Sequence, residues 1–149
     1  MSGHIWEAIM KELWFRGELK EIGRDECFEL LGSRSVGRIG YCTSGGAVIL
    51  PVNHAVIGGE IVVRVSPGGQ TARYLRDNAP EPDLTYEVDD FDDYTESGWS
   101  VLVTGTARAT SPESLASLTD RPVPWPAGDY WDYVRIHPTR VTGRRLVPA

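Results

Sequence analysis

The segment EIVVRVSPGGQTARYL, residues 60–75, combines a strand, a bend and a helix with one arginine. Its β-branched residues favour a strand, Pro67-Gly68-Gly69 favours a bend, and residues 70–78 favour a short helix that ends before Pro80. Arg64 lies inside the strand, shortly before the bend. The first N–H groups of a helix attract anions, and an arginine can donate two parallel hydrogen bonds to a phosphate. The segment therefore predicts a phosphate site, with an ordinary strand–turn–helix connection as the alternative.

A hairpin is predicted just before this bend, because Gly58-Gly59 separates two apolar runs, residues 47–57 and 60–66. If the two glycines form the turn, Ile57 faces Glu60 and the pairing can be counted outward. The count places four residues on one face, namely Pro51, Asn53, Arg64 and Ser66. The other face is then apolar, with Val52, Val56, Ile61, Val63 and Val65. The first face could line a ligand groove or simply meet water, and the pattern alone leaves both open.

The remaining sequence predicts more strands and a few helices. Strands are expected over residues 35–43, 83–91 and 98–110, and a final strand pair within residues 133–146, where His137 ends the first member. Helices are expected at three places, Ile5–Phe15, Arg24–Leu31 and after Pro112, followed by a proline-rich loop over residues 121–130. The sum is a mainly β protein, an antiparallel barrel with peripheral helices. We expect residues 1–17 to be a helical extension and residues 18–149 to be the barrel domain.

The composition excludes several classes of protein. A net charge of −6 disfavours a nucleic-acid binder, which needs a basic face. No apolar run approaches the roughly 20 residues that span a bilayer, and the N-terminus does not resemble a secretory signal. Cys27 and Cys42 form no CxxC pair, so neither a zinc site nor a disulfide framework is expected. A cytoplasmic protein fits these features best.

Other candidate chemistry is weak. His54 falls on the apolar face of its strand, which favours a buried, hydrogen-bonded imidazole over a catalytic base. There is no HExxH and no GxSxG, so neither a metal enzyme nor a serine hydrolase is expected. The acidic stretch at residues 87–96 lacks the spacing of a calcium loop and is expected to be a solvated strand end. Both cysteines are expected to be packing residues. No catalytic acid or base can be named.

Four segments together resemble the pyridoxamine 5′-phosphate oxidase-like superfamily, and most closely its small flavin-nucleotide-binding branch. They are CFELLGSRSVGRIGY, VILPVNHAVIGGEIVVRVSPGG, YEVDDFDDYTESGWSVLVTGTA and RIHPTRVTGRRL. The resemblance covers about Glu21 to Leu146. It implies a split β-barrel of six to seven antiparallel strands that binds FMN as a homodimer, with the cofactor in grooves between the subunits. The implied activity is that of a flavin-dependent oxidoreductase whose substrate is unknown.

The resemblance also implies which residues contact the flavin. Leu50-Pro51-Val52-Asn53 would lie along the flavin ring. Arg64, Val65 and Ser66, with the bend through Gly69, Gln70 and Thr71, would hold the phosphate. Ser100, beside Trp99, would reach the flavin region, although a tryptophan in a long strand is more often a core residue.

The sequence departs from the family pattern at the start of the helix. The family commonly has a basic residue where this chain has Gln70-Thr71, and Arg73, one turn further on, is the candidate replacement. The departure makes a deazaflavin coenzyme the alternative to FMN. The substrate-binding segment of true pyridoxamine 5′-phosphate oxidases is not visible, so we do not expect that reaction. A non-catalytic protein that binds or senses a flavin is the alternative from another class.

Overall fold

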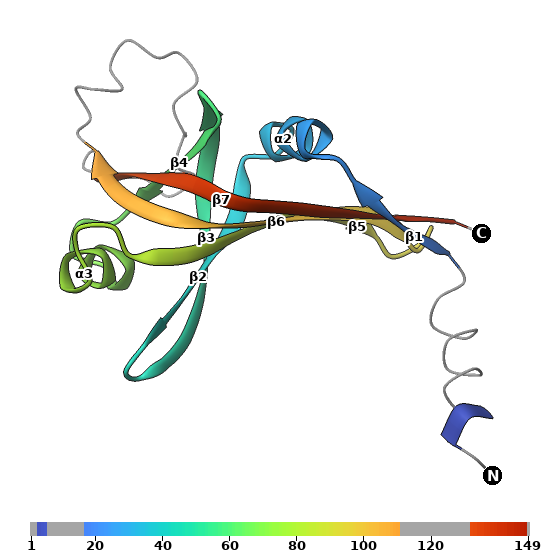
Figure 1. The fold of residues 1–149 in the computed structure, drawn as a ribbon, viewed down its shortest axis with the longest axis horizontal. Coiled ribbons are helices and arrows are strands. Elements are labelled where there is room, and N and C mark those ends of the chain that lie inside the picture. Colours follow the sequence, from blue (N-terminus) through green and yellow to red (C-terminus); the bar gives the residue numbers. More distant parts are fainter. Residues whose placement is uncertain (1–2, 6–16, 111–131, 149) are drawn as a thin grey trace.

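A computed structural model of the chain describes residues 3–5, 17–110 and 132–148 (Figure 1). Most of the predicted helix Ile5–Phe15, the helix after Pro112 and the proline-rich loop lie outside these residues. The elements follow one another as β1 (Glu18–Ile22), α2 (Arg24–Gly32), β2 (Val36–Thr43), β3 (Gly46–Ile57), β4 (Glu60–Val65), α3 (Gln70–Asp77), β5 (Asp83–Asp92), β6 (Ser97–Thr110) and β7 (Asp132–Val147).

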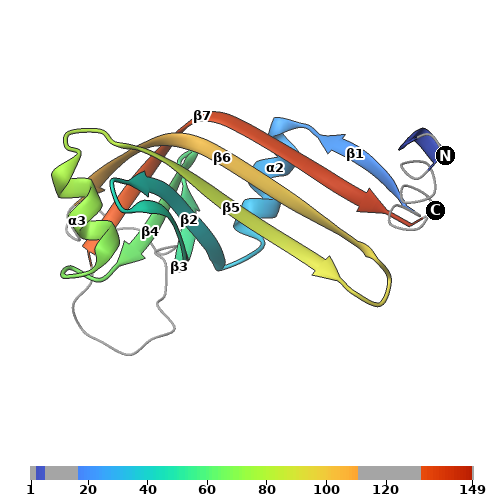
Figure 2. The same ribbon diagram turned by 90° about the horizontal axis from the view of Figure 1, so that it is seen from below.

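The described strands form one antiparallel sheet that closes on itself. Their order is β1-β7-β4-β3-β2-β5-β6, and β6 also pairs with β7, which closes the sheet into a barrel. The contact between β2 and β5 is short, because only Arg38, Ile39 and Gly40 of β2 pair there. Figure 2 shows β5, β6 and β7 continuing well beyond the barrel, where β1 joins the edge of β7. The predicted fold class, a mainly β split barrel, is confirmed.

The predicted hairpin has the predicted register. Ile57 pairs with Glu60, and the ladder continues through His54 and Val63. Gly58 and Gly59 have φ angles of 59° and 77°, in the left-handed region that a two-residue hairpin turn requires and that glycine adopts without strain. The turn therefore fixes which side chains of β3 and β4 share a face.

The barrel interior is filled by aliphatic side chains from every wall strand. Its fully buried members include Ile39, Ile61, Val63, Val88, Val101, Val103, Val134 and Ile136. His54 is buried with them, as predicted, and its ring nitrogens contact the Leu31 carbonyl oxygen at 2.8 Å and the Tyr86 hydroxyl at 2.5 Å. Burial lowers the pKa of His54, so the imidazole is neutral and links α2 to the barrel wall.

Three details differ from the sequence expectations. β1 was not predicted, because its sequence ELKEI is mostly charged. The final strand pair is instead one strand, β7, which continues through Pro138. The pairing with β6 shifts register at Thr104/Gly105, and a bulge of this kind accommodates a proline that cannot donate a ladder hydrogen bond.

Cys27 is buried as expected, but Cys42 is exposed. Within the described residues, no helix is long and apolar enough to cross a membrane.

Candidate functional site

A pocket of about 220 Å³ lies where β4 runs into α3, with β3 as its opposite wall. We call it the Arg64 pocket. It is lined by Leu50, Pro51, Val52, Asn53, Arg64, Val65, Ser66, Gly69, Gln70 and Thr71. The structure thus brings together in one hollow all of the sequence-predicted site residues except Trp99 and Ser100.

The β3 wall of this pocket is held from behind by the segment before β2. The Asn53 side-chain nitrogen donates to the Ser35 carbonyl oxygen at 3.2 Å, and the His54 backbone N–H donates to the same oxygen at 3.0 Å. Asn53 is buried as a result, whereas Pro51 is exposed at the rim. The wall is therefore a fixed surface, apolar at Leu50, Pro51 and Val52.

Arg64 is half-buried and is held by Tyr133 of β7, its cross-strand neighbour. The arginine Nε donates to the Tyr133 hydroxyl oxygen at 2.8 Å, and Nη2 donates to the same oxygen. The guanidinium carbon also lies 4.7 Å from the centre of the tyrosine ring. These contacts orient the guanidinium without involving any carboxylate.

The neutral partner distinguishes Arg64 from half of the ten other arginines of the described chain. Five others form ion pairs with aspartate or glutamate, namely Arg34, Arg38, Arg108, Arg135 and Arg145. A carboxylate neutralises an arginine, whereas a phenol hydroxyl does not. Arg64 therefore keeps its full positive charge inside a pocket, which is the arrangement that an anionic ligand requires.

The N-terminus of α3 opens onto the same pocket. Gly69 is its N-cap residue, no side chain caps this end, and the first turn contains no acidic residue. The first N–H groups of the helix are consequently left for a ligand to satisfy. Thr71 is buried there, and its hydroxyl lies 3.2 Å from that of Tyr41. An uncapped helix end beside an uncompensated arginine is suited to binding a phosphate.

The bend before α3 is compact because Gly69 lies close to Ser66, and not because its glycines adopt positive φ angles. The Gly69 N–H donates to the Ser66 carbonyl oxygen at 3.0 Å, and neither Gly68 nor Gly69 has a positive φ. A Cβ at residue 69 would lie 3.2 Å from the Ser66 carbonyl oxygen, which is a tight contact. Gly69 thus permits a close approach of the chain and is not needed for an unusual backbone angle.

Two further arginines of α3 lie near the bend but do not line the pocket. Arg76 reaches the Pro67 carbonyl oxygen at 3.4 Å and braces the loop. Arg73 is exposed on the helix surface, and its backbone N–H donates to Gly69. The candidate replacement for the family's basic residue is therefore close in sequence to the pocket but is not among the residues that line it.

Trp99 and Ser100 lie away from the Arg64 pocket in the single chain. Trp99 is buried in the barrel core, whereas Ser100 is half-buried and belongs to the opposite face of β6. Ser100 pairs with Asp89 on one side and with Arg144 on the other. Ser100 is therefore not among the residues that line the Arg64 pocket.

Sequence reasoning missed Tyr133. Its position opposite Arg64 depends on the pairing of β4 with β7, two strands whose nearest ends, Val65 and Asp132, are 67 positions apart in the sequence. No local turn signal connects them. The only signal in the sequence was a tyrosine at the start of an apolar strand, which is ordinary for a core residue.

A pair of acidic residues, Glu87 and Asp89, lies on the outer face of β5. Arg38 of β2 contacts both, at 3.3 Å from Glu87 and 3.2 Å from Asp89. Burial raises the pKa of Glu87 to about 7, and the neighbouring Asp89 acts in the same direction while Arg38 opposes it. Arg38 also pairs with Pro51, so this cluster adjoins the rim of the Arg64 pocket. No group of three potential metal ligands occurs in the described part of the chain.

Comparison with known proteins relates this chain to a family. The family model described as pyridoxamine 5′-phosphate oxidase matches residues 23–145. The uncharacterized protein Rv0080 of Mycobacterium tuberculosis is 36% identical over 132 residues, which cover 87% of each chain.

Solved structures show the same relationship. A candidate pyridoxamine 5′-phosphate oxidase from Corynebacterium glutamicum superposes with a TM-score of 0.72 at 30% identity, covering 88% of this chain and 95% of that one. The FAD binding protein of Mycobacterium smegmatis superposes with a TM-score of 0.64 at 30% identity, covering 86% and 98%.

Proposed function

The chain belongs to the pyridoxamine 5′-phosphate oxidase family, and we propose that it binds FMN in the Arg64 pocket and acts as a flavin-dependent oxidoreductase. The observation that carries this proposal is the uncompensated charge of Arg64 beside the uncapped N-terminus of α3. Both features attract a phosphate group, and the Ser66 hydroxyl adds a donor at the pocket surface. The similar Mycobacterium smegmatis protein is described as binding FAD, which supports a flavin.

One set of pocket residues would bind the phosphate, and another would contact the flavin ring system. Arg64, the first N–H groups of α3 and Ser66 would hold the phosphate. The apolar wall at Leu50, Pro51 and Val52 would exclude water from one side of the ring system. The flavin, when bound, supplies the hydride or electron transfer. No side chain that lines the pocket is a carboxylate, histidine or cysteine, so the protein contributes binding and electrostatics.

That absence of an acid or base favours a second candidate, a non-catalytic protein that binds or senses a flavin. The two functions differ in turnover. An oxidoreductase with bound flavin should catalyse repeated transfer of reducing equivalents from a reduced nicotinamide to an acceptor such as a quinone. A sensing protein should bind the flavin equally well and show no turnover.

The number of phosphate-binding groups in the pocket supports FMN as the ligand. The described residues offer one arginine and one helix end, which suit the single phosphate of FMN. The absence of a basic side chain at Gln70-Thr71 weakens the site and keeps a deazaflavin coenzyme as the alternative. FAD, with two phosphates, would need a further contact, for which the exposed Arg73 of α3 is a candidate.

The functional form is proposed to be a homodimer, because the pocket of one chain is incomplete. Complete sites for small molecules occupy about 300–1,000 Å³, whereas the Arg64 pocket has about 220 Å³. Pro51 at the rim of the pocket pairs with Arg38, and Arg38 pairs with Glu87 on the outer face of β5. Figure 2 views this face, which no described helix covers. A second copy on this face would close the open side of the pocket.

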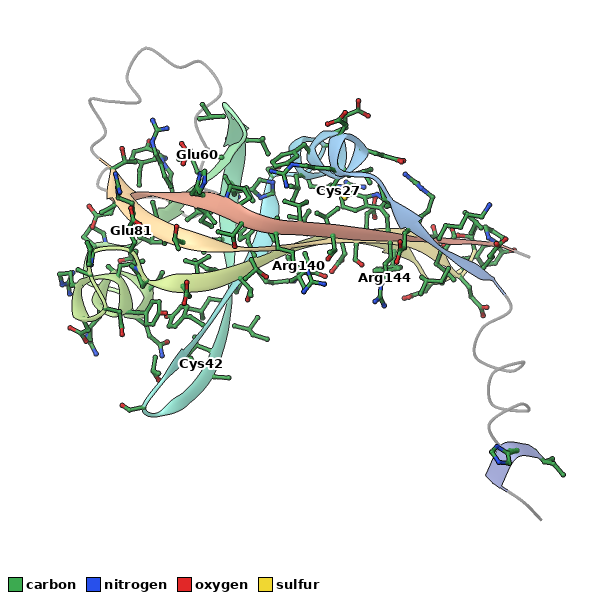
Figure 3. The ribbon with its side chains drawn as sticks, in the orientation of Figure 1. Cys27, Cys42, Glu60, Glu81, Arg140 and Arg144 are labelled. Atoms are coloured by element: carbon green, nitrogen blue, oxygen red, sulfur yellow. The ribbon has the colours of Figure 1, made fainter. Side chains whose placement is uncertain are left out.

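The charges on this face are self-complementary. β5 presents Glu87 and Asp89, β6 is neutral with Leu102 46% exposed, and β7 presents Arg140 and Arg144. Figure 3 shows both arginines on the side of the sheet opposite Cys27, and neither has an ion-pair partner in the described chain. A two-fold axis along β6 would place the acidic strand of each copy over the basic strand of the other.

The test is direct. The purified protein should be titrated with FMN, FAD and a deazaflavin while ligand fluorescence is followed, and its mass in solution should be measured by light scattering. We expect tightest binding of FMN and the mass of a dimer. Failure to bind any of the three would overturn the flavin function, and tighter binding of the deazaflavin would replace FMN by the alternative. A monomeric flavin-loaded protein would overturn only the proposed dimer.

A further inference from the structure

Tyr133 is buried, with 2% of its surface exposed, although it lies on the outer side of the barrel wall. Its ring packs against Val62 and Ile57 in a small apolar cluster that is separate from the main core. The ring is therefore fixed by β3 and β4 together, while its hydroxyl group accepts the two hydrogen bonds from Arg64. The cluster fixes the position of that hydroxyl oxygen in the absence of any ligand.

The Tyr133 hydroxyl group is suited to hold an arginine that binds an anion, because it accepts hydrogen bonds and carries no charge. The phenol oxygen accepts two hydrogen bonds from Arg64, one from Nε and one from Nη2. The remaining guanidinium N–H groups are left for another acceptor. The tyrosine ring adds a cation–π contact, which stabilises the positive charge without neutralising it.

We propose that Tyr133 is a positioning residue, which orients Arg64 in advance so that the guanidinium can bind the flavin phosphate; this inference rests on the proposed function. A free arginine side chain loses rotamer freedom when it binds a ligand, which weakens binding. Tyr133 imposes that loss during folding instead. The effect should therefore be specific to ligands that carry a phosphate.

The experiment compares Tyr133→Phe with the unaltered protein, using FMN and riboflavin as probes. Riboflavin has the same ring system and no phosphate. Phenylalanine keeps the packing against Val62 and removes only the hydroxyl group. We expect FMN affinity to fall about 2- to 13-fold, the size of the ordering cost, and riboflavin affinity to stay the same. In an Arg64→Ala background, Tyr133→Phe should have no further effect on FMN.

The matched control is Tyr86→Phe, which also removes a buried tyrosine hydroxyl bond, the one to His54 inside the barrel. It should lower stability without changing the preference for FMN over riboflavin. A readout that needs no ligand is the NMR signal of the Arg64 Nε–H group, which should exchange slowly with water and should lose this protection in Tyr133→Phe.

The possible outcomes distinguish a failure of the positioning role of Tyr133 from a failure of the proposed flavin function. Unchanged FMN affinity in Tyr133→Phe, or an equal loss for riboflavin, would overturn the positioning role and leave the flavin function standing. A further loss in the Arg64→Ala background would also overturn it, because Tyr133 would then act other than through Arg64. If the unaltered protein binds no FMN while its Arg64 Nε–H is protected, the flavin function fails and the structural coupling of the two residues survives.

Discussion

Arg64 and Arg38 occupy similar positions and have different electrostatic states. Each projects from a strand of the same sheet, toward the outer side of the barrel. Arg64 is held by the neutral hydroxyl of Tyr133, whereas Arg38 lies between the carboxylates of Glu87 and Asp89. The cross-strand neighbour, and not the arginine itself, thus determines whether the charge is available to a ligand. One site is prepared to bind an anion, and the other is already neutralised.

The largest loss of FMN affinity is expected when a carboxylate is placed in the Arg64 pocket. Ser66→Asp would give Arg64 the kind of partner that Arg38 has. The new carboxylate would both neutralise the guanidinium and repel a phosphate, so we expect FMN affinity to fall about a hundredfold, or about 2.7 kcal/mol. Isothermal calorimetry would measure the change. Ser66→Ala is the matched control and should cost less than tenfold; equal losses in the two variants would contradict this account.

Removing Arg64 and Arg38 separately compares the contributions of the two arginines to FMN affinity. Arg64→Ala should lower FMN affinity by about 10- to 100-fold, because a hydrogen-bonded charge contributes about 1.5–3 kcal/mol. Arg38→Ala should leave FMN affinity within about twofold, since its charge is already balanced. Far-UV circular dichroism should show that both variants fold. Similar losses in both would mean that the positive charge of the whole face, and not Arg64 in particular, attracts the phosphate.

The smallest expected effect concerns the acidic side of the Arg38 site. The folded-state pKa of Glu87 is raised to about 7 from an ordinary 4.5, so the folded protein binds a proton that the unfolded chain has lost. This contribution to stability is present below pH 4.5 and is lost as the pH rises through 7. Because Glu87 is one-third exposed, solvent screening should limit it to about 1 kcal/mol or less.

Urea unfolding at pH 5 and pH 8 would detect this dependence. Between pH 5 and pH 8, Glu87→Gln should lose less unfolding free energy than the unaltered protein. At pH 8 the variant should be the more stable of the two. Glu29→Gln, an exposed substitution on α2, is the control and should follow the unaltered protein. A Glu87→Gln profile parallel to that of the unaltered protein would show that this carboxyl group titrates normally.

The sequence predicted the Arg64 pocket because one turn determines it. Gly58-Gly59 admits a two-residue turn, and the turn sets the register that places Pro51 and Asn53 on the same face as Arg64. The strand–bend–helix order then brings the N-terminus of α3 beside that face. Each of these steps involves residues close together in the chain, so local rules were sufficient.

The features that could not be predicted depend on contacts between distant segments. Tyr133 meets Arg64 only through the β4–β7 pairing, and β1 becomes a strand only because β7 offers it an edge. The continuous course of β7 through Pro138 depends on the register shift opposite Gly105, where a Cβ would lie 2.2 Å from the His137 carbonyl oxygen. Local propensity carries no information on any of these pairings.

The short strand β1 has a consequence for how copies of this chain can associate. It forms one end of the described sheet, and its five residues include Glu18, Lys20 and Glu21, all exposed. Charged side chains on a brief terminal strand discourage the addition of another strand and therefore the growth of fibres. Association of copies by strand-to-strand pairing at this edge is therefore disfavoured.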